Sequence, residues 1–91
     1  MKDIQTYKDR VKYEFDQWYG SQISVTLTEE EMNHVIDVGT SVLQTRDGGI
    51  QGGSFVQAVV NNDLSGTYNR ADSINKRFIP FYIILKDHVI I

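Results

Sequence analysis

The glycine-rich stretch over residues 46–54 is the part of this sequence whose residue types are best suited to binding a ligand. It holds four of the seven glycines in a chain of 91 residues, and an apolar run follows it directly. Glycines ahead of a helix let backbone N–H groups approach a ligand closely, and the N-terminus of a helix favours an anion. Ser54 could add a hydroxyl, and Arg46 a bidentate contact to a phosphate. The stretch is no Walker A loop, because Gly-Lys-Ser/Thr is missing.

Tyr68 and Arg70 could complete such a site, Tyr68 by stacking on a base and Arg70 by contacting a phosphate. The glycine-rich stretch and Arg70 also have a purely structural interpretation. The glycines could cap one helix and form a tight turn into the next, and Arg70 could pair with a carboxylate while Asp72 caps a helix. In the ligand-binding interpretation the site residues are Arg46, Gly48, Gly49, Gly52, Gly53, Ser54, Tyr68 and Arg70.

Side chains for catalysis or metal binding are scarce. The chain has no cysteine and two histidines, His34 and His88. Glu30 and His34 stand four residues apart and could share a metal, but no second histidine stands at helical spacing. A surface histidine beside carboxylates is therefore the simpler interpretation of His34. With two histidines in the chain, the sequence also gives no basis for assigning a Ser/His/Asp catalytic triad. We expect no catalytic residues, no metal site, no cofactor and no enzymatic activity.

Length and composition limit the architecture that has to position these residues. Ninety-one residues predict a single domain, 1–91, and 41% hydrophobic with 23% charged residues is typical of a globular chain. A chain of this size buries only about 60–65% of its unfolded surface. Oligomerisation is a common remedy for so small a core, so we expect a homo-oligomer.

Hydrophobic spacing predicts two long helices in the first half. Apolar residues recur on a 3.6-residue period over residues 2–19 and again over residues 28–45. Thr28 and Glu31 have the spacing of a capping box at the start of the second helix. Gly39 inside that helix costs about 1 kcal/mol relative to alanine, so we expect it to mark a close crossing of helices.

The remaining elements are less regular. Residues 21–27 alternate polar and apolar side chains and predict an extended connection over the core. A helix is expected over residues 54–62, followed by a short turn. The last element, residues 70–86, has helical spacing but also a β-branched and aromatic run, so Pro80 either kinks a helix or begins a strand. We expect an all-α fold, a small helical domain with a glycine-looped helical hairpin and a kinked last helix; the alternative is an α+β fold with a C-terminal β-hairpin.

Nine of the ten aromatic side chains are assigned to an expected core set or an expected surface set. The core is expected to take Tyr7, Phe15, Trp18, Phe55 and Phe78. Partial exposure, which suits recognition of a partner, is expected for Tyr13, Tyr19, Tyr68 and Tyr82.

Charge is unevenly distributed along the chain. Residues 1–45 carry four basic and eight acidic side chains, a net charge of −4, whereas residues 46–91 carry five basic and four acidic, a net charge of +1. A weakly basic half disfavours binding to duplex nucleic acid. No run of 18 apolar residues predicts a membrane span, and the first residues lack the apolar core of a signal peptide. Together with the lack of cysteine, this predicts a cytoplasmic protein with no membrane contact.

The run Gly52–Leu64, GGSFVQAVVNNDL, followed by Arg70-Ala71-Asp72 and Asn75, resembles a pattern in small proteins of phages, prophages and plasmids. Proteins of that family read approximately G-G-x-F-(V/L)-x-A-V-L-x-N-D-L, then R-A-D-x-x-N, then an apolar helix. The resemblance covers about residues 46–85 and implies a phage-type setting and helices, with no activity attached. The C-terminus departs from the pattern, since family members continue as Tyr-Asn with a proline-containing tail.

Three functions are compatible with these observations. The first is a non-catalytic phage-type binding protein in the cytoplasm of the host cell, which sequesters a small phosphorylated ligand such as a nucleotide immune signal and so counters host defence. The second is a protein–protein inhibitor or adaptor that acts on a host defence or replication protein. The third is a regulatory nucleic-acid binder, which the charge disfavours.

Overall fold

In the computed structural model, which describes residues 3–91, all regular secondary structure is α-helical. The helices in this range are α1 (Ile4–Trp18), α2 (Gly20–Ser24), α3 (Glu29–Arg46), α4 (Ser54–Val60), α5 (Leu64–Arg70), α6 (Ser73–Arg77) and α7 (Ile79–His88). They enclose one hydrophobic core, to which α1, α3, α4 and α7 contribute most side chains. The expected all-α class is confirmed, and the alternative with a C-terminal β-hairpin is wrong.

Each of the two long helices begins after a residue whose side chain caps it. The Thr28 hydroxyl accepts a hydrogen bond from the Glu31 backbone N–H at 3.1 Å, and the Glu31 carboxylate accepts one from the Thr28 backbone N–H at 2.9 Å. This is the predicted capping box. Asp3 caps α1 in the same way, since its carboxylate accepts a hydrogen bond from the Thr6 N–H at 2.9 Å.

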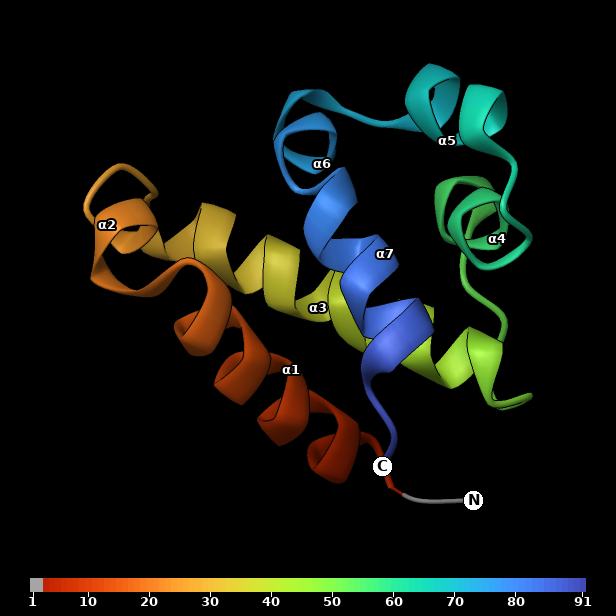
Figure 1. Cartoon of the computed structure of the whole chain (residues 1–91), viewed down its shortest axis with the longest axis horizontal. Helices are drawn as coiled ribbons and strands as arrows, with labels where there is room; N and C mark the ends of the chain where they lie inside the picture. The colour runs from red at the N-terminus through yellow and green to blue at the C-terminus, as the bar shows by residue number, and fades with distance from the viewer. Residues whose placement is uncertain (1–2) are drawn as a thin grey trace.

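Gly39 lies on α3 at a place where both α1 and α7 pack against it. A Cβ atom at this position would lie 2.8 Å from Val11 Cγ1 on α1 and 2.9 Å from Leu85 Cδ1 on α7. Only a residue without a side chain leaves room for both helices, so the predicted close crossing is confirmed. Figure 1 shows α7 running across α3, with α1 on one side and α4 on the other.

The prediction of an extended connection over residues 21–27 is wrong, because the first of these residues form the short helix α2. Gly20 follows the C-cap of α1, adopts a left-handed φ of +53° and turns the chain into α2. Strand-like alternation is stable only beside a partner strand, and here a helical turn satisfies the backbone instead: Val25 N–H donates to the Ser21 carbonyl at 3.2 Å. Leu27 is buried in the core, but Val25 is 82% exposed.

The C-terminal segment is also divided differently from the single kinked helix expected over residues 70–86. The expected short turn is the helix α5, and Asp72 then caps α6 by accepting a hydrogen bond from the Asn75 N–H at 2.7 Å. Phe78 separates α6 from α7. Pro80 lies in the first turn of α7, where its missing N–H would have no helical partner in any case. Pro80 therefore lies at the beginning of a helix and does not kink one.

Most of the aromatic expectations are confirmed, with two corrections. Trp18 is 56% exposed, because it ends α1 and lies one turn beyond the last buried position, Phe15. Tyr82 is completely buried, and its hydroxyl donates to Asn75 Oδ1 at 2.8 Å. No helix within residues 3–91 combines the length and apolar character needed to cross a membrane.

Candidate functional site

A polar groove of about 210 Å³ runs between α4 and α5. Its lining residues are Ser54, Gln57, Ala58, Asn61, Asp63 and Arg70. Ser54 begins α4 and Arg70 ends α5, and the two consecutive helices pack against each other as a helical hairpin. The turn between them contains Asn62 in a left-handed conformation, with φ of 59°. We call this set of lining residues the polar groove.

Arg70 supplies the positive charge of the polar groove. Its side chain is 49% exposed, and Nη1 lies 3.9 Å from Asp63 Oδ2. A Cβ atom on Gly66 would overlap both the guanidinium and this carboxylate, so the glycine leaves the space in which they meet. An exposed ion pair at this distance is worth at most about 1 kcal/mol. The guanidinium can therefore exchange it for an anionic ligand at small cost.

The other groove residues supply hydroxyl, amide and carboxylate groups. The Asp63 carboxylate caps α5, since Oδ1 accepts a hydrogen bond from the Gly66 N–H at 2.9 Å, and Oδ2 faces Arg70. The Gln57 amide donates to the Gly52 carbonyl at 2.8 Å, which fixes the orientation of its oxygen. Ser54 is exposed at the start of α4. Such a set fits a polar ligand that has both an anionic group and hydroxyl groups.

The first glycines of residues 46–54 end α3 and leave little for a ligand. Gly48 has a left-handed φ of +81°. Gly49 N–H donates to the Gln44 carbonyl at 2.8 Å, and Gly48 N–H donates to the Thr45 carbonyl at 3.2 Å. These are the two hydrogen bonds of a Schellman cap. Both N–H groups are thus engaged within the chain.

The second pair of glycines lets the chain pass close to α3 and enter α4. Gly52 N–H donates to Thr45 Oγ1 at 2.9 Å. A Cβ atom on Gly52 would lie 2.5 Å from Ser41 Oγ and 2.7 Å from Val56 Cγ1, so this position requires glycine for packing. Gly53 is the N-cap of α4, and the space around its Cα is open.

Arg46 lies away from the polar groove, at the C-terminal end of α7. Its Nη1 donates to the Leu85 carbonyl at 3.1 Å, to the Lys86 carbonyl at 3.2 Å and to the Val89 carbonyl. Its Nε donates to Asp47 Oδ1 at 2.8 Å. The carbonyl groups at the end of a helix lack helical partners and carry partial negative charge, so a guanidinium is a suitable cap. All of these interactions are structural.

Tyr68 and Arg70 point to different sides of α5, because residues two apart on a helix do not face each other. Tyr68 is 47% exposed and shares its face with Leu64, one turn earlier. Of the eight predicted site residues, the structure brings Ser54 and Arg70 into one groove, with Gly53 beside Ser54. It places Arg46 and Tyr68 elsewhere.

Three polar residues of the groove were missed from the sequence: Gln57, Asn61 and Asp63. The spacing of Ser54, Gln57 and Asn61 is i, i+3 and i+7, which places them on one face of a helix. This polar stripe on one face of the predicted helix is the signal from which the groove could have been recognised in the sequence. Asp63 could have been recognised as an N-cap three residues before Gly66.

The two histidines lie outside the polar groove. His34 Nε2 lies 3.0 Å from Asp72 Oδ2 and links α3 to the N-cap of α6. His34 is exposed beside a carboxylate, as expected. Among residues 3–91, no three His, Asp or Glu side chains are arranged to hold a metal ion.

Comparisons of the chain with models of protein families, with curated proteins and with solved structures give no match. The resemblance to a phage-type family therefore stays a prediction.

Proposed function

We propose that this chain is a non-catalytic binding protein that captures a small phosphorylated ligand in the polar groove. The observation that carries the proposal is Arg70, a half-exposed guanidinium held 3.9 Å from Asp63 beside a groove of about 210 Å³. Arginine has a planar fork of donors that matches phosphate oxygens, and it stays charged at all physiological pH values. A ligand phosphate would displace a weak ion pair and gain stronger hydrogen bonds.

The other groove residues have complementary roles in this proposal. The Ser54 hydroxyl donates to a second phosphate oxygen, while the Asn61 amide and the Asp63 carboxylate bind hydroxyl groups of the ligand. An acidic side chain that accepts hydrogen bonds from ribose hydroxyls is a common way to hold a nucleotide sugar. Asp63 opposes an anion placed directly against it, so the phosphate is expected at the Ser54 side of Arg70.

The size of the polar groove limits the ligand. Ordinary pockets for cofactors and drug-sized molecules enclose roughly 300–1,000 Å³, whereas the groove has about 210 Å³. A phosphoryl group with one sugar is the portion that fits, and a nucleotide base would remain outside. Tyr68 lies on the other face of α5 and is not available to stack on that base.

The phage-type resemblance supplies the setting that we propose for this capture. A nucleotide signal of host defence carries the phosphate and ribose groups that the groove is suited to bind. A protein present in excess of such a signal lowers its free concentration without chemical change. The proposed mechanism is therefore stoichiometric sequestration in the host cytoplasm.

Isothermal titration calorimetry with inorganic phosphate, ribose 5-phosphate, ADP-ribose and cyclic nucleotides tests this proposal. We expect at least one phosphorylated compound to bind and Arg70→Gln to weaken its binding about tenfold or more, because a charge-assisted hydrogen bond is worth about 1.5–3 kcal/mol. Arg77→Gln is the matched control, since it removes another exposed arginine outside the groove. Equal affinity of the two variants, or no binding by any compound, would disprove the proposal.

A further inference from the structure

Asp63 is held in place by several hydrogen bonds at the turn between α4 and α5. The Asp63 N–H donates to the Ala58 carbonyl at 2.9 Å, and the Asp63 carbonyl accepts hydrogen bonds from the Thr67 N–H at 2.8 Å and the Thr67 hydroxyl at 2.7 Å. Its Oδ1 atom accepts the capping hydrogen bond from the Gly66 N–H at 2.9 Å. These contacts fix the backbone and the orientation of the side chain, so Oδ2 has a defined position in the polar groove.

The Oδ2 atom of Asp63 is the acceptor that this arrangement leaves for a ligand. Within residues 3–91, Oδ2 accepts no hydrogen bond, and the one cation within 4 Å of it is the Arg70 guanidinium, at 3.9 Å. This distance is too long for a hydrogen bond. The side chain of Asp63 is 53% exposed, so a ligand in the groove reaches Oδ2 without any movement of the backbone.

A ligand that binds Arg70 changes the surroundings of this oxygen. When a phosphate takes over the guanidinium, the Asp63 carboxylate loses its nearby positive charge and gains a negative neighbour. The carboxylate cannot turn away without breaking the cap of α5. A hydrogen-bond donor on the ligand offsets this cost, because hydrogen bonds to a charged acceptor are among the stronger ones. An anion that lacks such a donor meets the repulsion without compensation.

Asp63 differs from the other polar residues of the groove because its ionised side chain accepts hydrogen bonds only. The other polar lining residues each carry an N–H or O–H group that can donate to a phosphate: Ser54, Gln57, Asn61 and Arg70. Those four side chains favour any phosphate in the groove. Asp63 is therefore the lining residue that discriminates between one phosphorylated compound and another.

We propose that Asp63 sets the specificity of the polar groove, so that it binds phosphate esters of sugars and other polyols and rejects phosphates that carry no hydroxyl group nearby. This inference rests on the function proposed above, since it requires that Arg70 binds the phosphate. A hydroxyl group of the ligand donates to Asp63 Oδ2 while the phosphate binds Arg70 and Ser54. Inorganic phosphate and simple alkyl phosphates are then poor ligands.

NMR titrations of the ¹⁵N-labelled full chain with ribose 5-phosphate and with ethyl phosphate test this specificity, because both compounds are phosphate monoesters and only the first has hydroxyl groups. We expect ribose 5-phosphate to bind about tenfold or more tightly than ethyl phosphate. Asp63→Asn should reduce this ratio to about threefold or less and strengthen the binding of ethyl phosphate, since the amide is uncharged and its NH₂ group donates to phosphate. Asparagine caps helices as well as aspartate does, so the variant keeps the hydrogen bond from Gly66.

Asp16→Asn is the matched control, because it makes the same change of net charge at an exposed position on α1 outside the groove and should leave the ratio unchanged. Thermal unfolding establishes that both variants fold. Equal affinity of the wild type for the two compounds, or an unchanged ratio in Asp63→Asn, would overturn the inference; if Arg70→Gln still weakens both compounds, the proposed function stands without it. Binding of neither compound would also overturn the inference, and the proposed function fails with it if ADP-ribose and the cyclic nucleotides do not bind either.

Discussion

At the scale of single residues, Arg46 and Arg70 show that the contacts of a side chain decide its role. Both were predicted to bind phosphate. The structure surrounds Arg46 with the carbonyl groups that end α7, whereas Arg70 lies beside an open groove with Asp63 at 3.9 Å. Sequence spacing could not distinguish the two arginines, because Arg46 and its partner Leu85 are 39 residues apart.

Arg46→Gln is expected to lower the free energy of unfolding by about 2–4 kcal/mol, since hydrogen bonds from a charged donor are worth about 1.5–3 kcal/mol each and the loss leaves part-buried carbonyls unpaired. Unfolding in urea measures the change. Arg77→Gln is the control, and an exposed substitution of this kind should stay within about 0.5 kcal/mol of the wild type. If Arg46→Gln leaves stability unchanged and removes phosphate binding, Arg46 belongs to a ligand site after all.

The buried hydroxyl of Tyr82 makes the stability of the fold depend on pH. Burial raises the pKa of its hydroxyl, and the charge of Asp72 raises that pKa further; burial also raises the pKa of Tyr7 and of Tyr19. An unfolded tyrosine loses its proton near pH 10. Because the folded pKa is the higher one, the stabilisation is complete below about pH 10 and is lost as the pH rises beyond it.

The free energy of unfolding should therefore fall above about pH 10, by up to about 1.4 kcal/mol per pH unit for the buried Tyr82. Tyr82→Phe should make this fall less steep, although it also leaves the buried Asn75 oxygen without its donor and so lowers stability at neutral pH. Urea unfolding at pH 8 to 11 measures both effects, with Tyr13→Phe as the exposed control. An identical slope for Tyr82→Phe and the wild type would contradict this explanation.

At the scale of elements, local signals predicted α1 and α3 well, and long-range contacts decided the rest. The Thr28 capping box and the apolar stripe of α3 depend only on residues within the helix. The boundary between α6 and α7 depends instead on Phe78 entering the core, where it is 1% exposed. The alternation over residues 21–27 was misleading because no second strand exists in the described chain to pair with it.

Gly39 gives a test at this scale, because it sets the distance between α3 and its neighbours. A valine side chain there would overlap Val11 and Leu85, and overpacking of this kind typically costs about 1–3 kcal/mol. Gly39→Val should therefore lower the midpoint of thermal unfolding by several degrees. Gly53→Ala is the matched control, since nothing lies within 4 Å of a Cβ atom at that position. Equal effects of the two substitutions would mean that the helices can move apart at Gly39 without cost.

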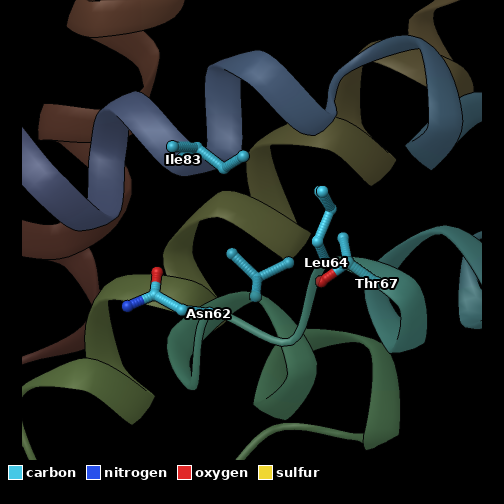
Figure 2. Close-up of a pocket in the computed structure, with 5 residues that line it drawn as sticks. Asn62, Leu64, Thr67 and Ile83 are labelled. Carbon is cyan, nitrogen blue, oxygen red and sulfur yellow. The ribbon is translucent and has the colours of Figure 1, made fainter.

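At the scale of the whole molecule, the α4–α5 hairpin has two surfaces of different chemistry. The polar groove contains Arg70 and Asp63, and a separate, more apolar depression beside α7 is lined by Leu64 and Ile83 (Figure 2). The sequence predicted that α4 is a helix, and it identified Ser54 and Arg70 as candidate ligand-binding residues. It could not show that these two residues line one groove, because the packing of α5 against α4 depends on the turn at Asn62 between them. The expected homo-oligomer stays a prediction.

The central claim is that the polar groove binds a phosphorylated ligand and leaves it unchanged. The most direct measurement records ³¹P and ¹⁵N NMR spectra of the labelled chain during a titration with ribose 5-phosphate. We predict amide shifts at Ser54, Asn61 and Arg70, none at Gly48 or Gly49, and a ³¹P spectrum with no new phosphorus species after a day. Shifts confined to the Gly48–Gly49 turn, or a new phosphorus signal that grows with time, would contradict the claim.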